Sequence, residues 1–227
     1  MNIIISVLIC VTFAVAVRKL KLLSEEGFRK LLHLMLLAIL TVWVLNYDSW
    51  KEAVGIMLVF IVVVYPVLYF FEKNEKLEGF FAGREKGELK RSLTIMGLMF
   101  IIVTYVCEGL YGSKVLALAS IYAWGPGDAA AALIGTKFGK HKLYEKKSIE
   151  GTLAMFVCAF VFVFILLRLG EGYDFSIIIP ATIITAIAAT LSELFAKNGY
   201  DTLICPITSM VALLTVLTIM GQVQLTW

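Results

Sequence analysis

Ionisable side chains recur within or beside apolar runs of this 227-residue chain. Charged groups are costly in the hydrocarbon of a membrane, so each one is a candidate for chemistry. The candidates fall in four stretches: FRKLLH with Arg29, Lys30 and His33, GPGDAAAALIGTKFGKHKL with Asp128, KKSIEGTLA with Lys147, Ser148 and Glu150, and SELFAKNGYDTLICP with Glu193 and Asp201.

These residue types suit the handling of phosphates. Neighbouring carboxylates favour Mg²⁺, a hard cation that takes oxygen ligands and is often shared with substrate phosphates. Lys and Arg favour the phosphates themselves, Arg through paired hydrogen bonds. The triplet Gly125-Pro126-Gly127 predicts a helix break, after which Asp128 caps a new helix. Phosphoryl or nucleotidyl transfer needs little beyond such positioning and charge neutralisation.

The elements that must position these groups are membrane helices. The chain is 60% hydrophobic and 16% charged, whereas soluble domains are about 45–50% apolar. Runs of about 20 apolar residues match a hydrocarbon core about 30 Å thick. We predict an all-α polytopic membrane protein, with seven spans if one short run is interfacial and otherwise eight. The eight spans are approximately 3–17, 31–46, 53–71, 93–110, 115–135, 152–169, 176–195 and 203–221.

Loop charges predict the orientation of these spans. Residues 18–30, 72–92 and 136–150 hold five, six and five Lys or Arg residues, and they alternate with loops that are nearly uncharged. Basic loops stay cytoplasmic, which places the amino terminus outside and every candidate residue in the cytoplasmic half. The protein is therefore expected in a cell membrane or an ER-type membrane, with its site facing the cytoplasm.

The same composition limits the partners and the domain count. The net charge of +3 resides in the basic loops and reflects topology, so no nucleic-acid partner is expected. No loop is long enough to bury a core of its own, so residues 1–227 are expected to form one membrane domain. The four cysteines lie singly in apolar runs and are typical of small core residues.

Simpler structural roles stand beside the functional ones. Arg29 and Lys30 could be topology anchors, and Gly135 and Gly139 could be small residues at a helix contact. Glu193 and Lys197 have i, i+4 spacing and could neutralise each other. A broken helix with a buried carboxylate also occurs in ion-coupled transporters, but their sites lie at the midplane, whereas these groups gather in one leaflet.

The motifs resemble the shared core of phosphatidate cytidylyltransferases and CTP-dependent lipid kinases, the latter including dolichol kinase, phytol kinase and yeast-type diacylglycerol kinase. The shared pattern is an Asp, a small-residue stretch, Gly-x-x-x-Gly, a basic loop and Lys-Ser/Thr-x-Glu-Gly. FRKLLH and SELFAKNGYDTLICP are similar to motifs of the kinase branch, although Thr202 and Ile204 depart from the second of them. The long signature that ends cytidylyltransferases is missing from this sequence, which favours the kinase branch.

The resemblance implies Mg²⁺-dependent transfer of phosphate from CTP to the hydroxyl of a membrane lipid alcohol: a polyprenol, a phytol-type isoprenoid or diacylglycerol. It leaves nucleotidyl transfer to make a CDP-lipid as the alternative, and oligomeric state open. The implied metal ligands are Asp128, Glu150 and Asp201, and the implied base is Asp128, Glu193 or His33. The implied nucleotide-binding residues are Arg29, Lys30, Gly135, Gly139, Lys142, Lys147, Ser148 and Gly151.

Overall fold

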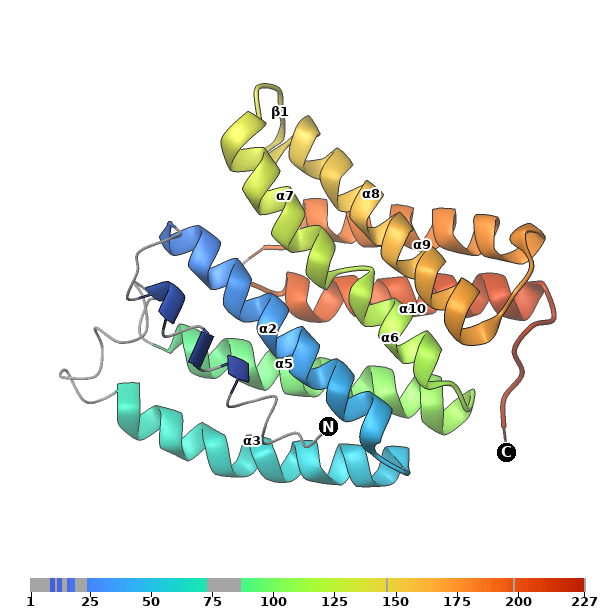
Figure 1. Ribbon diagram of the computed structural model, residues 1–227, viewed down its shortest axis with the longest axis horizontal. Coiled ribbons are helices and arrows are strands. Elements are labelled where there is room, and N and C mark those ends of the chain that lie inside the picture. Colours follow the sequence, from blue (N-terminus) through green and yellow to red (C-terminus); the bar gives the residue numbers. More distant parts are fainter. Residues whose placement is uncertain are drawn as a thin grey trace. The chain divides into compact units, whose positions relative to one another are not determined.

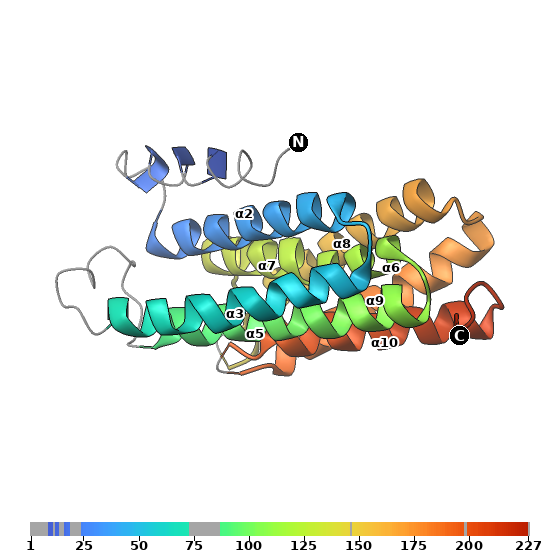
Figure 2. The ribbon, with the colours of Figure 1, turned by 90° about the horizontal axis from the view of Figure 1, so that it is seen from below.

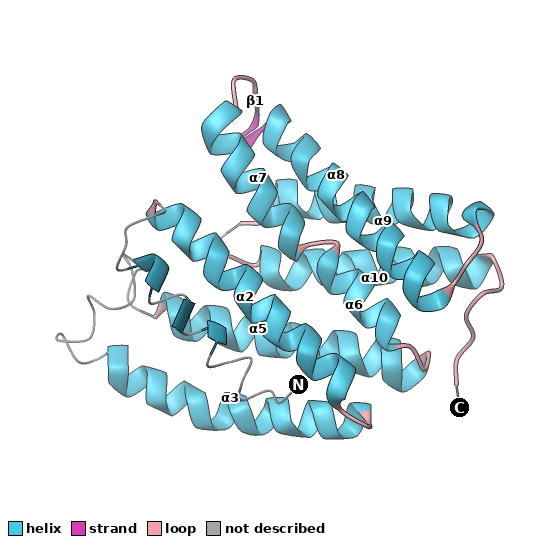
Figure 3. Cartoon of the chain, viewed as in Figure 1, coloured by secondary structure: helices cyan, strands magenta, loops and turns pink. Residues whose placement is uncertain are grey.

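The computed structural model describes residues 9–10, 12–13, 16–18, 24–72, 87–145, 147–197 and 199–226. Apart from one short hairpin, the ordered elements among these residues are helices, as Figure 3 shows. Internal contacts divide the chain into two compact units, Met1–Gly97 and Leu98–Trp227. That the chain works as a single membrane domain stays a prediction.

The first unit contains α2 (Glu25–Asn46), α3 (Trp50–Glu72) and the start of α5 (Glu88–Thr104). The Ser24 hydroxyl caps α2 by accepting a hydrogen bond of 3.1 Å from the backbone N–H of Gly27. On α5, a Cβ atom at Gly97 would lie 2.7 Å from the Ile61 side chain of α3. The absence of a side chain at Gly97 therefore lets these two helices approach each other closely.

The second unit contains the rest of α5 and the elements that follow it. These are η1 (Tyr105–Leu110), α6 (Lys114–Tyr122), α7 (Gly125–Phe138), β1 (Lys142–Tyr144), β2 (Lys147–Ser148), α8 (Ile149–Leu166), η2 (Leu167–Glu171), α9 (Phe175–Phe195) and α10 (Asp201–Ile219). Helix α7 packs on α8, α8 packs on α9, and α9 packs on α10, while α6 packs on α8 and α10. The close pairing of α7 with α8 is visible in both Figure 1 and Figure 2.

The apolar helices confirm the prediction of a polytopic membrane protein. Six helices in the described part of the chain are long and apolar enough to cross a membrane. They are Gly27–Asn46, Trp50–Val67, Lys90–Leu110, Ile149–Glu171, Phe175–Phe195 and Asp201–Ile219, and they match six of the eight predicted spans. The predicted span 115–135 is divided between α6 and α7, and the span 3–17 lies largely outside the described residues.

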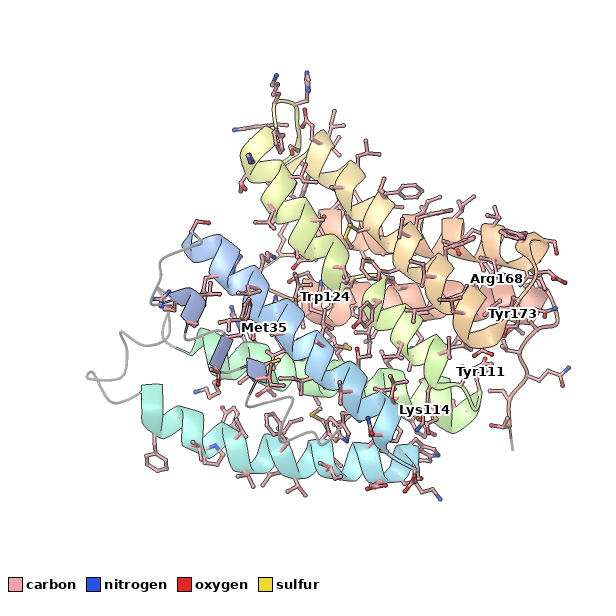
Figure 4. All side chains as sticks on the ribbon, in the orientation of Figure 1. Met35, Tyr111, Lys114, Trp124, Arg168 and Tyr173 are labelled. Atoms are coloured by element: carbon pink, nitrogen blue, oxygen red, sulfur yellow. The ribbon has the colours of Figure 1, made fainter. Side chains whose placement is uncertain are left out.

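Hydrogen bonds connect η2 to the residue before α6 and to the turn that leads into α9. The Ser113 hydroxyl accepts a hydrogen bond from the backbone N–H of Leu116 and donates one to the Glu171 carboxylate. The Arg168 guanidinium donates to the carbonyl oxygen of Tyr173 over 2.9 Å, and Figure 4 shows these two residues beside the turn into α9. The Ser113–Glu171 hydrogen bond joins the start of α6 to η2, which continues directly from α8.

Candidate functional site

Three carboxylates from three different helices converge in the second unit. Asp128 lies in the first turn of α7, Glu193 in the last turn of α9, and Asp201 begins α10. Asp128 and Glu193 are buried, at 6% and 7% exposure, and Asp201 is half-buried. The charges of Asp128 and Asp201 both act on the Glu193 carboxyl. A cluster of like charges in an apolar bundle is unfavourable for folding alone, so its presence indicates a functional role.

Cys205, one turn after Asp201 on α10, gives a second indication of this convergence. Its buried thiol lies within the electrostatic field of all three carboxylates. The sequence predicted that these carboxylates would share one leaflet, and in the structure all three lie within electrostatic range of Cys205. Because Cys205 is buried in an apolar helix face, it serves here as a small packing residue, as predicted for the cysteines.

Lys147 supplies the counter-charge to this group. Its ammonium Nζ lies 2.8 Å from Glu193 Oε1 and also donates a hydrogen bond to the Glu193 carbonyl oxygen. Lys147 stands on β2, 46 positions before Glu193, so the contact depends entirely on the tertiary fold. The pair is mostly buried, and such a pair is retained only when both charges are well compensated.

Glu193 therefore does not pair with Lys197, and that i, i+4 interpretation is wrong. Helix α9 ends at Phe195, so Lys197 lies beyond the last helical turn, and the helical spacing does not apply to it. Its ammonium instead lies 2.5 Å from Glu145 Oε1. The hydrogen bond to Glu145 raises the pKa of Lys197 above its ordinary value, so the Lys197 ammonium is charged at neutral pH.

The break between α6 and α7 positions Asp128 differently from the prediction. The two turn residues are Ala123 and Trp124, and the helix restarts at Gly125, with Pro126 in the first turn, where a missing N–H costs little. The backbone N–H of Asp128 already donates to the carbonyl oxygen of Trp124 over 2.8 Å. Asp128 is thus inside the first turn instead of capping it. Trp124, which is labelled in Figure 4, is buried at this junction between α6 and α7.

The predicted nucleotide-binding glycines and Ser148 lie where α7 crosses α8. A Cβ atom at Gly151 would lie 2.8 Å from the Ala131 carbonyl oxygen and 3.2 Å from Gly135 Cα, and one at Gly139 would lie 2.6 Å from Ser148 Oγ. Ser148 caps α8 by accepting a hydrogen bond of 3.2 Å from the Gly151 N–H. These residues keep the backbones of α7 and α8 in close contact, as the alternative role of small residues at a helix contact predicts. Nucleotide binding by them stays a prediction.

This contact makes a testable prediction at Gly151. In Gly151→Ala the new methyl group meets backbone atoms of α7 that have no side-chain freedom to move away. Overpacking of this kind costs about 1–3 kcal/mol, so we expect the thermal unfolding temperature in detergent to fall by several degrees and transferase activity to fall with it. Gly55→Ala on α3 is the matched control, since a Cβ atom there meets nothing within 4 Å. Ala is the better helix former, so the control should unfold at the same or a higher temperature. Equal behaviour of the two variants would contradict the packing role.

Glu150 and Lys142 lie toward the far end of α7 from Asp128. Glu150 Oε1 lies 2.8 Å from His141 Nδ1, and Lys142 is exposed on β1. Throughout the described ranges no three His, Cys, Asp or Glu side chains are placed to hold a metal ion together. The carboxylates therefore do not form an all-protein cage. Mg²⁺ in its usual mode needs only one or two carboxylates, completed by waters and substrate phosphates, so Mg²⁺ binding here stays a prediction.

Arg29, Lys30 and His33 lie on α2, in the first unit. Their spacing places them on one helix face, with Lys30 buried and the other two half-buried. Their predicted contribution to the site stays a prediction.

The contacts that sequence reasoning missed lie between the α7–α8 hairpin and the end of α9. Tyr144 and Phe195 make an edge-to-face contact with ring centroids 5.5 Å apart, next to the Glu145–Lys197 pair. The residues are 51 or more positions apart, and they carry no motif. The only sequence signal was the mixed charge of the basic loop, which gives no partner for Glu145.

Comparison with known proteins gives one informative relative. The chain is 29% identical over 197 residues to a phytol kinase of Synechocystis sp., a match that covers 84% of this chain and 79% of that protein. No protein-family model and no solved structure matches the chain significantly. A match of this extent includes parts of both units. This similarity supports a lipid-kinase family for the chain.

Proposed function

We propose that this protein transfers the γ-phosphate of CTP to the hydroxyl of a membrane-embedded isoprenoid alcohol of the phytol type. The observation that carries the proposal is the convergence of Asp128, Glu193 and Asp201 with the Lys147 ammonium inside an apolar helix bundle. A site of this kind can neutralise and orient phosphates next to a hydroxyl whose tail stays in the bilayer. The similarity to a phytol kinase supports the choice of acceptor. CTP as donor rests on the motif resemblance.

The chain's own residues would divide the work as follows. Lys147, assisted by Lys142, would bind the triphosphate. Asp128 and Asp201 would hold Mg²⁺, which when bound neutralises charge on the phosphate oxygens. The bond between the γ-phosphorus and its bridging oxygen breaks as the lipid oxygen attacks, giving lipid phosphate and CDP.

A carboxylate near the acceptor would take the hydroxyl proton. We assign this role to Asp128 or Glu193, two buried carboxylates of the second unit. Glu193 is held by Lys147 in the structure, so a phosphate that attracts Lys147 would leave Glu193 more available as a base. Under the predicted orientation this site opens toward the cytoplasm, where the nucleotide is found.

Product analysis tests the proposal directly. The purified protein in lipid nanodiscs would receive Mg²⁺, each of the four nucleotides labelled at the γ-phosphate, and one acceptor: phytol, a long polyprenol, diacylglycerol or phosphatidate. We expect labelled lipid phosphate with CTP and phytol in at least tenfold excess over every other pair. Pyrophosphate with CDP-lipid would establish nucleotidyl transfer instead. Ion flux in liposomes without turnover of any nucleotide would establish a transporter.

A further inference from the structure

The hairpin between α7 and α8 carries Lys147 and cannot be rigid by itself. Its strands, Lys142–Tyr144 and Lys147–Ser148, contain three and two residues, and a two-stranded hairpin of this size is not stable alone in water. The register is also irregular between its two pairs. The position of Lys147 must therefore depend on contacts that the hairpin makes with other elements.

Those contacts run to the end of α9, at three neighbouring points. Lys147 reaches Glu193, the Tyr144 ring packs edge-on against Phe195, and Glu145 pairs with Lys197 at 2.5 Å. The Lys197 ammonium also lies 5.5 Å from the centroid of the Tyr144 ring, within cation–π range. Glu193 and Phe195 in the last turn of α9, and Lys197 just beyond it, thus meet three residues of the hairpin.

Glu145 occupies the tip of this hairpin in a conformation that is unusual for a residue with a side chain. Its φ is +48°, and it is the only non-glycine residue with positive φ among those the structure describes. Such a conformation is tolerated when surrounding contacts determine it. The ion pair with Lys197 is a contact of this kind, because it holds the Glu145 side chain to a residue that is not part of the hairpin.

We propose that Glu145 and Lys197, together with the Tyr144–Phe195 contact, position Lys147 at the carboxylate cluster for nucleotide binding. Glu145 and Lys197 are positioning residues, since they act through the hairpin. The inference rests on the proposed function for the role of Lys147. Both members of the pair are about half exposed, at 55% and 53%, so the expected effect of losing the pair is about two- to fivefold.

Charge reversal tests this inference. In the full chain in nanodiscs, Lys197→Glu and Glu145→Lys should each raise the KM for CTP about two- to fivefold and leave kcat within about twofold. The double variant, with the pair reversed, should return KM to near the wild-type value. Lys51→Glu, an equal charge change at an exposed residue of α3, is the control and should leave KM unchanged.

Hydrogen exchange gives a readout that needs no turnover. We expect amides of residues 142–145 and 147 to exchange faster in each single variant and to regain protection in the double variant. Unchanged exchange in the singles, or a double variant as unprotected as they are, would overturn the positioning role. If no nucleotide is turned over by any variant, the proposed function fails, while the exchange pattern still decides whether the pair fixes the hairpin.

Discussion

Asp128→Asn is expected to lower phosphoryl transfer at least 100-fold while the protein stays folded. Asn has the same shape but removes the charge that would hold Mg²⁺ or accept the hydroxyl proton, and a single group of either kind contributes about 10²–10⁴ in rate. The negative charge of Asp128 acts on the Glu193 carboxyl, so removing that charge relieves repulsion. The unfolding temperature should therefore stay the same or rise. Labelled CTP and thermal unfolding in detergent measure the two effects on one preparation.

A matched control separates charge at the site from charge elsewhere. Asp174→Asn makes the same change at an exposed residue that precedes α9, and it should leave both activity and unfolding temperature near the wild type. Near wild-type transfer by Asp128→Asn would remove Asp128 from the metal and base roles. A large fall in the unfolding temperature of Asp128→Asn would instead make it a structural residue.

The carboxylate cluster could be predicted from the sequence because the membrane simplifies the problem. Helix spans follow from apolar length and orientation follows from loop charges, so the sequence alone assigns Asp128, Glu193 and Asp201 to one leaflet. In a compact bundle, helix ends in one leaflet are near neighbours. This reasoning needs no knowledge of which helix packs on which, and the action of the Asp128 and Asp201 charges on the Glu193 carboxyl is consistent with the grouping.

The pairing of individual side chains could not be predicted in this way. Lys147 has several acidic residues within its leaflet, and its choice of Glu193 depends on how the short hairpin folds back over α9. The i, i+4 rule suggested Lys197 for Glu193 because it assumes a continuous helix, whereas α9 stops two residues before Lys197. Helix ends are set within one or two residues by local contacts that hydropathy does not resolve.

The role of the motif glycines could not be predicted from the sequence either. Gly135 and Gly151 belong to a motif that suggests phosphate binding, but a Cβ atom at Gly151 would lie 2.8 Å from the Ala131 carbonyl oxygen, so packing alone excludes a side chain there. One sequence does not separate the two roles, since a backbone that must approach another backbone and one that must approach a phosphate both exclude a side chain. The Gly151→Ala comparison reports on the first role only.

Lys147→Met is expected to lower kcat/KM for CTP at least 100-fold and also to destabilise the protein. The variant removes the phosphate-binding charge and leaves the Glu193 carboxylate, only 10% exposed at its side chain, without its counter-ion. Breaking a fully buried pair costs about 3–5 kcal/mol. Lys147 is partly exposed, at 29%, so a loss of about 2 kcal/mol is the appropriate expectation on that scale. A fall in activity alone would therefore mix two causes.

The double variant Lys147→Met/Glu193→Gln separates these causes. With both charges gone, the buried carboxylate no longer needs a counter-ion, so the unfolding temperature should return most of the way to that of the wild type. Activity should not return, because neither the phosphate-binding ammonium nor the candidate base is present. Recovery of both would show that Lys147 acts only by stabilising Glu193.

Glu193→Gln alone completes the cycle. Because Lys147 then lacks its carboxylate partner, it should bind CTP more tightly in an equilibrium binding assay while turnover falls. Weaker CTP binding in that variant would instead place Glu193 among the groups that hold the nucleotide's metal ion.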